Sequence, residues 1–122
     1  MAKRVLIVDD AMIMRMRIKE IAQSAGWEIA GEASNGEEAV ARYKELRPDL
    51  VTMDIVMPTM DGVSALRLLR QECPEARVVM VSAVDQREKL TECIRLGVVD
   101  FIVKPFDKVR LKLFFEKYGE VK

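Results

Sequence analysis

Five short apolar runs, each followed by a longer amphipathic stretch, constrain the fold of this 122-residue chain more than any other feature. The runs at Val5–Val8 and Val78–Val81 are continuously apolar, which is typical of strands that are covered on both faces. The expected strands are Arg4–Val8, Glu28–Ala33, Leu50–Met53, Arg77–Val81 and Asp100–Val103. The expected helices are Ile13–Ala25, Glu37–Leu46, Gly62–Glu72, Gln86–Leu96 and Lys108–Tyr118. Because repeated strand–helix units cross over with one hand, the alternation predicts an α/β fold: a doubly wound, five-stranded parallel sheet with helices on both faces.

Residues that begin and end helices agree with this alternation. Asn35 and Asp107 are suited to cap the starts of helices, and Gly26 and Gly97 stand where helices are expected to end. No linker, repeat or low-complexity segment interrupts the pattern, and the length suits one hydrophobic core. We therefore expect a single domain over residues 1–122.

Charge and residue usage exclude several classes of protein. Twenty Lys and Arg balance 20 Asp and Glu, so no broad basic field favours direct nucleic-acid binding. The apolar runs are far shorter than the roughly 20 residues that span a bilayer, and the N-terminus does not resemble a signal peptide. We expect a cytoplasmic protein without membrane insertion. The chain has no His, which excludes His-based nucleophilic catalysis and His zinc sites, and we expect Cys73 and Cys93 to be reduced.

The residues after the predicted strands carry the chemistry, because functional sites of open parallel sheets lie at the carboxyl ends of strands. Those positions hold three carboxylates, a hydroxyl and an ammonium, on Asp9, Asp10, Asp54, Ser82 and Lys104. Two like charges ~4 Å apart repel by on the order of 4 kcal/mol at an effective dielectric near 20, so three acids need a cation. Mg²⁺ prefers oxygen ligands and contacts phosphate oxygens. The set therefore indicates a phosphoryl-transfer site with a carboxylate nucleophile, Asp54.

Each of these residues also has a simpler explanation when it is taken alone. Asp10 could cap a helix, Asp54 could begin a turn, and Ser82 could cap the following helix. Lys104 could be a solvated charge at a strand end, which is the commonest place for a Lys. Their joint placement at four separate strand ends favours the reactive site over these explanations.

Four motifs carry a resemblance to a known family. Val8–Asp10, Met53–Gly62, Val81–Ala83 and Val103–Phe106 resemble the receiver domain of two-component response regulators. The resemblance covers essentially the whole chain, and the motifs occur in the family's order. It implies the flavodoxin-like fold of CheY-like proteins, with the strand order 2-1-3-4-5.

The resemblance also implies a role for each reactive residue. Asp54 would be the phosphoacceptor, Asp10 would bind Mg²⁺ directly, and Asp9 would bind it chiefly through water. Asp54 itself and the backbone carbonyl of Val56 would complete the protein ligands of the metal. Lys104 would pair with the acceptor carboxylate and afterwards with the phosphoryl group.

Further residues would form the switch and shape the site. Ser82 resembles the hydroxyl that moves to bond a phosphoryl oxygen, and Phe101 resembles the aromatic residue that turns inward with it. Phe101 is equally well explained as an apolar strand residue. Pro58 and Gly62 would shape the loop after the acceptor, and Pro105 would follow a cis peptide bond.

Two valines and the single Trp bear on how the switch behaves. In this family the positions two residues after the acceptor and two after the switch hydroxyl tune dephosphorylation, and here they are Val56 and Val84. Neither side chain can orient a water or accept a proton, so we expect slow self-dephosphorylation. Trp27 lies before the second predicted strand, and we expect its fluorescence to report activation poorly.

The function that the resemblance implies is a phosphorylation-dependent signalling switch rather than an enzyme acting on other substrates. A sensor histidine kinase would supply the phosphoryl group. The state would be read on the face formed by Gln86–Leu96, Asp100–Val103 and Lys108–Tyr118. The segments Lys3–Ala11 and Asp100–Phe106 look most like single-domain chemotaxis regulators, which implies a flagellar motor switch protein as the target.

Other functions stay open at this stage. Within the same family, the chain could be a phosphorelay intermediate or the isolated receiver of a multidomain regulator, such as a DNA-binding one. From another class, a metal-dependent phosphatase of the haloacid dehalogenase type also uses an Asp nucleophile. That class needs a second Asp two residues later, where this chain has Val56.

Overall fold

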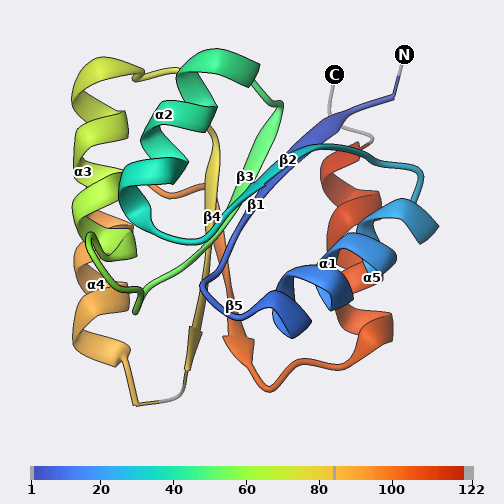
Figure 1. The fold of residues 1–122 in the computed structure, drawn as a ribbon. Helices are drawn as coiled ribbons and strands as arrows, with labels where there is room; N and C mark the ends of the chain where they lie inside the picture. Colours follow the sequence, from blue (N-terminus) through green and yellow to red (C-terminus); the bar gives the residue numbers. More distant parts are fainter. Residues whose placement is uncertain (1, 84, 120–122) are drawn as a thin grey trace.

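The computed structural model describes residues 2–83 and 85–119, and in this part of the chain five strands alternate with five helices. In chain order the elements are β1 (Arg4–Val8), α1 (Met12–Ser24), β2 (Glu28–Ala33), α2 (Gly36–Leu46), β3 (Leu50–Asp54), α3 (Gly62–Glu72), β4 (Val78–Ala83), α4 (Arg87–Leu96), β5 (Asp100–Lys104) and α5 (Lys108–Gly119). The strands form one parallel sheet in the order β2-β1-β3-β4-β5. Helices α1 and α5 cover one face, and α2, α3 and α4 cover the other (Figure 1). The predicted fold class and strand order are confirmed.

The sheet separates two hydrophobic clusters, which explains why the central strands are continuously apolar. Alternate residues of β1 point to opposite faces: Leu6 joins the cluster under α2, α3 and α4, and Ile7 joins the cluster under α1 and α5. Neither residue has any exposed surface. A strand with water on one face would have to be polar at every second position, and β1 is not.

Helix ends follow the predicted capping residues with one difference. The Asn35 side chain accepts the Glu38 N–H at the start of α2, and the Asp107 carboxylate accepts the Arg110 N–H at the start of α5. Gly97 ends α4 with a φ of 94°. Helix α1 ends earlier than expected, at Ser24, because Gly26 with its φ of 89° already belongs to the following turn.

The burial of side chains bears on two further expectations. Cys73 and Cys93 are both buried and free, as predicted. Trp27 is buried against Phe115, whose carbonyl accepts its indole N–H at 2.8 Å. Trp27 precedes β2 and therefore lies at the amino end of the sheet, opposite the carboxyl ends of the strands. Its poor response to activation stays a prediction.

None of the helices within residues 2–83 and 85–119 combines the length and the apolar character that crossing a bilayer requires.

The backbone of α3 comes close to the sheet at Gly62, where the helix begins over the end of β3. The Gly62 N–H donates to the Ile55 carbonyl at 2.7 Å. A Cβ atom on Gly62 would lie 2.2 Å from the Asp54 carbonyl oxygen and 3.0 Å from the Ile55 Cα. Both of these neighbours are backbone atoms, so neither can move without displacing the end of β3.

We expect Gly62→Ala to lower the free energy of unfolding by about 2–3 kcal/mol, the upper part of the range for overpacked sites. Urea unfolding followed by circular dichroism measures the change. Gly31→Ala is the matched control, because the Cβ there would come within 3 Å only of the end of the flexible Leu46 side chain, at 2.8 Å. Equal losses in the two variants would contradict this account of Gly62.

Candidate functional site

The register of the sheet brings the predicted site residues to one level at its carboxyl edge. Val8 pairs with Met53 across β1 and β3, so the next residues, Asp9 and Asp54, come to the same level. Across β4 and β5, Ala83 pairs with Lys104. Asp54, Ser82 and Lys104 lie within the last residues of their strands rather than after them, because the backbone ladder continues past the point where the side chains become polar.

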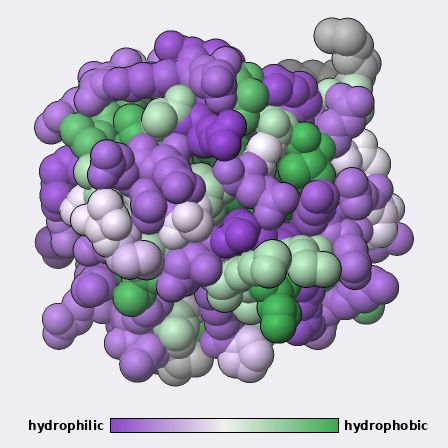
Figure 2. Space-filling model, viewed as in Figure 1, coloured by the Kyte–Doolittle hydropathy of each residue, from purple (hydrophilic) through white to green (hydrophobic). Residues whose placement is uncertain are grey.

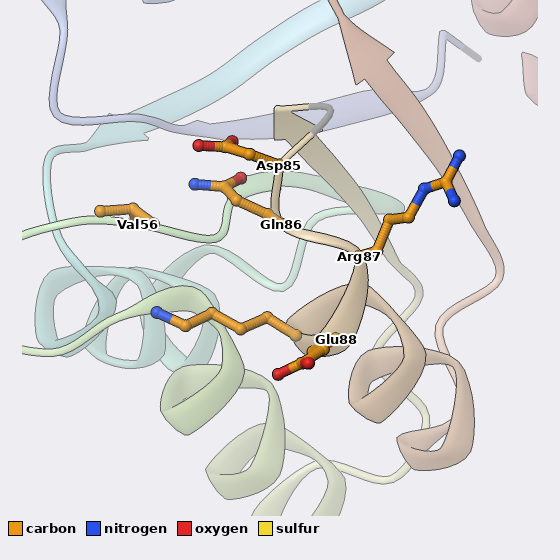
Figure 3. Close-up of a pocket in the computed structure, with 6 residues that line it drawn as sticks. Val56, Asp85, Gln86, Arg87 and Glu88 are labelled. Atoms are coloured by element: carbon orange, nitrogen blue, oxygen red, sulfur yellow. The ribbon is translucent and has the colours of Figure 1, made fainter.

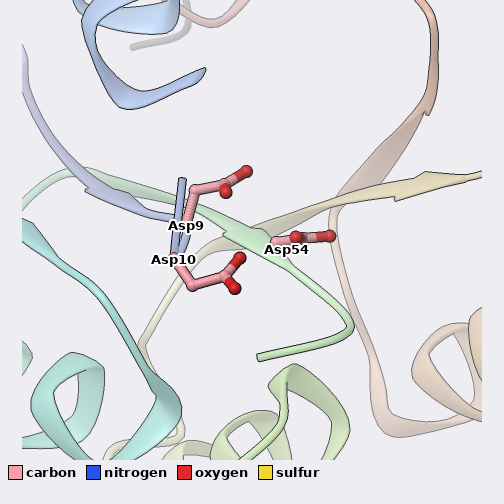
Figure 4. Close-up of side chains that lie close together, drawn as sticks. All are labelled: Asp9, Asp10 and Asp54. Carbon is pink, nitrogen blue, oxygen red and sulfur yellow. The ribbon is translucent and has the colours of Figure 1, made fainter. Parts of the chain in front are cut away.

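Three carboxylates gather at this edge. One oxygen from each of Asp9, Asp10 and Asp54 lies within 4.8 Å of the other two, and Figure 4 shows the three side chains directed to the same side of the sheet edge. Asp9 and Asp54 are buried, whereas Asp10 is exposed. The cluster is therefore open to solvent on the Asp10 side, which suits a hydrated cation.

Lys104 bridges the two buried carboxylates. Its Nζ lies 3.1 Å from Asp9 Oδ2 and 3.3 Å from Asp54 Oδ2. Three carboxylates and one ammonium leave two negative charges, which a divalent cation would balance. Hard oxygen ligands with open solvent access fit Mg²⁺, so the residues present fit the predicted metal.

Burial raises the pKa of the Asp54 carboxyl above its ordinary value; Lys104 lowers it and the charge of Asp9 raises it further. Burial by itself would lower the pKa of the Lys104 ammonium, but the charges of Asp54 and Asp9 outweigh burial and raise it. The ionised form of Asp54 is thus costly while only Lys104 faces it. A second cation at the cluster would favour ionisation, and the ionised carboxylate is the nucleophilic form.

The second oxygen of each buried carboxylate is held by the backbone. Asp9 Oδ1 accepts the Ala11 N–H at 2.9 Å, and Asp54 Oδ1 accepts the Ile55 N–H at 2.8 Å. The Arg15 guanidinium donates to the Asp9 carbonyl oxygen at 2.7 Å. The sequence analysis did not identify Arg15, because nothing in a helical Arg indicates that it reaches back to the preceding turn.

Ser82 has the environment that a switch hydroxyl needs. The residue is 1% exposed, and its Oγ has no hydrogen-bond partner among the described residues. It does not cap α4, since Gln86 is the residue in front of that helix. A buried hydroxyl without a partner is costly, so an incoming anionic oxygen would find a free donor. The switching role of Ser82 stays a prediction.

Phe101 points outward in this structure, with 41% of its surface exposed. A pocket of about 380 Å³ separates α4 from β5, and Phe101 and Ser82 both line it. The pocket offers space beside Ser82 for an inward turn of the ring. The turn itself stays a prediction.

The loops around the acceptor are fixed by backbone features. The Lys104–Pro105 peptide bond is cis, as predicted. In the loop that holds Pro58, the Met60 carbonyl accepts the Gly36 N–H at 2.8 Å, a contact that the sequence analysis missed. A Cβ on Gly36 would lie 2.6 Å from that carbonyl oxygen, so residue 36 has to be glycine for the start of α2 to pack against this loop.

Of the two valines expected to slow dephosphorylation, the structure describes Val56 and not Val84. Val56 is the second residue of the loop after the acceptor, and it is 47% exposed. Val84 lies outside the described residues. The slow dephosphorylation and the binding of a metal by the Val56 carbonyl both stay predictions.

Comparison with known proteins agrees with this geometry. The family model described as the response regulator receiver domain matches residues 5–116. The chain is 53% identical over 111 residues to the chemotaxis protein CheY of Thermotoga maritima, covering 91% of this chain and 92% of that protein. It is also 53% identical over 108 residues to protein CcdB of Bacillus subtilis, covering 88% and 90%. The solved CheX–CheY–BeF3–Mg complex from Borrelia burgdorferi matches with a TM-score of 0.89 at 38% identity, covering 98% of this chain and 90% of that one.

The raised pKa of Asp54 predicts how Asp54→Asn will change thermal stability in metal-free buffer. For an acid whose folded pKa lies above its unfolded one, the stabilisation is complete below the unfolded pKa and is lost as the pH rises through the folded pKa. At pH 7 the wild type therefore carries a cost that the neutral amide removes. We expect a midpoint a few degrees higher for Asp54→Asn by calorimetry, since about 1 kcal/mol moves a domain of this size by roughly 4 °C.

Addition of Mg²⁺ should reverse the order of the two proteins, because Asn supplies no charge to the cation. The matched control is Asp85→Asn, which removes an exposed carboxylate outside the cluster. We expect the control to leave both the metal-free midpoint and the Mg²⁺ response unchanged. A lower metal-free midpoint for Asp54→Asn would show that the Lys104 pair outweighs the cost of burial.

Proposed function

The chain belongs to the response regulator receiver family, and from this premise we propose that Asp54 is its phosphoacceptor. The protein is a two-component response regulator of the CheY-like kind, a signalling protein. The observation that carries the proposal is the pairing of the buried Asp54 with Lys104 inside a cluster of three carboxylates. That set supplies a nucleophile, a metal site and a cation for the transferred group. The family model matches residues 5–116, and we propose that the receiver domain comprises residues 1–122.

In the proposed reaction, the Asp54 carboxylate attacks the phosphorus of a phosphohistidine on a sensor histidine kinase. An O–P bond forms, the P–N bond breaks with its electron pair left on the nitrogen, and the histidine leaves as the neutral imidazole because its other ring nitrogen carries a proton. Mg²⁺ held by Asp10, Asp9, Asp54 and the Val56 carbonyl would neutralise the oxygens of the transferred group. Lys104 is already in place to follow the charge from the carboxylate onto a phosphoryl oxygen. Ser82 then donates its hydroxyl to another of these oxygens.

The proposed readout is the face formed by α4, β5 and α5. Six exposed apolar side chains lie on this face or, for Val99, in the turn before β5, and they are Ile94, Val99, Phe101, Val103, Val109 and Leu113. Arg87 lines a pocket with Phe101, and Arg110 and Lys117 line another with it, which favours a partner that combines apolar and acidic residues. Phosphorylation would change this face through Ser82 and Phe101, which share one pocket with α4.

We propose a flagellar motor switch protein as the partner of this face, because the Thermotoga relative is a chemotaxis protein. A CheX-like protein is a second partner of the phosphorylated form, since the Borrelia relative was solved in complex with CheX. We propose that the protein acts in the cytoplasm, where a sensor histidine kinase would supply the phosphoryl group. The alternative is a phosphorelay intermediate or a receiver in a longer regulator. It stays open because CcdB, which is not named as a chemotaxis protein, is as similar in sequence to this chain as the Thermotoga CheY is.

Intact mass after incubation with Mg²⁺ and acetyl phosphate tests the phosphoacceptor. We expect a gain of one phosphoryl group that is labile to hydroxylamine, requires Mg²⁺ and is absent from Asp54→Asn. Asp85→Asn, with its exposed carboxylate, should gain the group as the wild type does. The decay of the same species measures the lifetime, which we expect to exceed seconds. The proposal would be contradicted if the folded protein gained no mass from either acetyl phosphate or a histidine kinase.

Leu113→Asp tests the readout face, since it places a charge on an apolar side chain that is 59% exposed on α5. We expect phosphorylation to tighten binding to the motor switch protein by roughly 10-fold, within the usual range of such couplings. The variant should lose most of that binding while its phosphorylation rate is unchanged. Fluorescence anisotropy with the labelled partner measures both states.

The control for Leu113→Asp is Met16→Asp, on the exposed apolar patch over the start of α1 (Figure 2). Met16 is 53% exposed and lies on the opposite layer of the sheet from α4. If Met16→Asp weakens partner binding and Leu113→Asp does not, the readout belongs to the α1 layer.

A further inference from the structure

The side chain of Gln86 turns back from the start of α4 onto the end of β4. The side-chain Oε1 accepts the Ala83 N–H at 2.8 Å, and the backbone N–H of Gln86 donates to the Ala83 carbonyl at 3.1 Å. Gln86 precedes α4, but its side chain forms no capping bond with that helix. Among the described residues, the carboxamide oxygen therefore accepts only the Ala83 N–H. Figure 3 shows the Gln86 side chain extending from this turn over the pocket toward Val56, beside Asp85.

The pattern of hydrogen bonds along β4 shows which way the Ala83 amide points. The Arg77 carbonyl, just before β4, accepts from Val51 of β3, whereas the Val78 carbonyl accepts from Val99 on the β5 side. The N–H and C=O of a residue in an extended strand point to the same side, and that side alternates from residue to residue. Ala83 has the same parity as Arg77, so its N–H points toward β3.

The Ala83 amide faces the end of β3, which holds the proposed phosphoacceptor Asp54. The last pair of the β3–β4 ladder joins Asp54 to Val81, so the Ala83 N–H lies two residues beyond it, over the site. Backbone N–H groups at such strand ends are natural ligands of anionic oxygens. The neighbouring Ser82 gives an independent sign of a ligand here, because its buried Oγ has no partner among the described residues.

Besides the Ile55 N–H, three donors lie at the same sheet edge as Asp54, and they differ in their hydrogen-bond partners. Lys104 is paired with the carboxylates, and Ser82 Oγ has no partner among the described residues. The Ala83 N–H is occupied by Gln86. An oxygen on a phosphorylated Asp54 that reaches for this amide must displace the carboxamide.

We propose that Gln86 is a positioning residue that acts as a latch: its side chain competes with a phosphoryl oxygen for the Ala83 N–H. In the unmodified protein the bond ties the start of α4 to β4. Displacement releases Gln86 and with it the first turn of α4, which belongs to the proposed readout face. The inference rests on the proposed phosphorylation of Asp54 and names the contact through which the site reaches α4.

Beryllium fluoride with Mg²⁺ is the probe, and ¹⁵N-resolved NMR of the full chain reports both binding and the Ala83 amide. We expect Gln86→Ala to bind the probe roughly 2- to 10-fold more tightly, the factor that one neutral hydrogen bond contributes. The Ala83 amide of the free variant should exchange with solvent faster by a similar factor. Gln86→Glu should bind the probe more weakly than the wild type, because its carboxylate accepts more strongly and repels the anion.

The matched control is Gln71→Ala, which removes an exposed carboxamide from α3 and should change neither affinity nor exchange. Gln86→Met repeats the test with a side chain of similar length and no amide oxygen, should Gln86→Ala fail to fold by circular dichroism. Unchanged or weaker binding in Gln86→Ala and Gln86→Met would overturn the latch. If neither the wild type nor these variants bind beryllium fluoride, the result would instead count against the proposed phosphoacceptor.

Discussion

Asp9 and Asp54 lie buried side by side because one ammonium, that of Lys104, contacts an oxygen of each. Without it, two like charges at this spacing would repel by about 4 kcal/mol even at an effective dielectric of 20. Several features of the fold position the groups that make this contact. The parallel register sets the carboxylates level, β5 brings Lys104 in from the sheet edge, and the Ala11 and Ile55 amides fix the remaining oxygens. The two negative charges left over would be balanced by a divalent cation, and that cation would in turn attract the oxygens of a phosphoryl group.

Much of this site could be predicted from the sequence, because it depends on backbone topology. Strand ends can be recognised where an apolar run meets a polar residue, and parallel strands bring those ends to one edge. Asp9, Asp54 and Lys104 were placed correctly on that reasoning alone. The cis bond before Pro105 came from the family resemblance rather than from the residues, and the structure contains it.

The contacts that the sequence could not show depend on where side chains turn after the backbone is set. Arg15 reaches the Asp9 carbonyl, Gly36 donates to Met60, and Gln86 accepts from Ala83. Each of these contacts joins a residue in or just before a helix to a loop or to the end of a strand, and helical periodicity reports only which face of a helix is apolar. Phe101 illustrates the same limit: its place on β5 was predictable, but its outward rotamer depends on the space beside α4.

The uneven burial of the helices determines where a signal from Asp54 can travel. Five residues of α3 are buried, among them Leu66 and Leu69, whereas Cys93 is the single buried residue of α4. Moving α3 would expose a core, but moving α4 would expose little. Ser82 lies on the face of β4 that looks toward these helices, while Asp54 and Lys104 share the opposite face of the sheet. A phosphoryl group at the edge would bridge both layers, and α4, which has the fewest buried residues of the five helices, is the helix whose displacement would expose the least core.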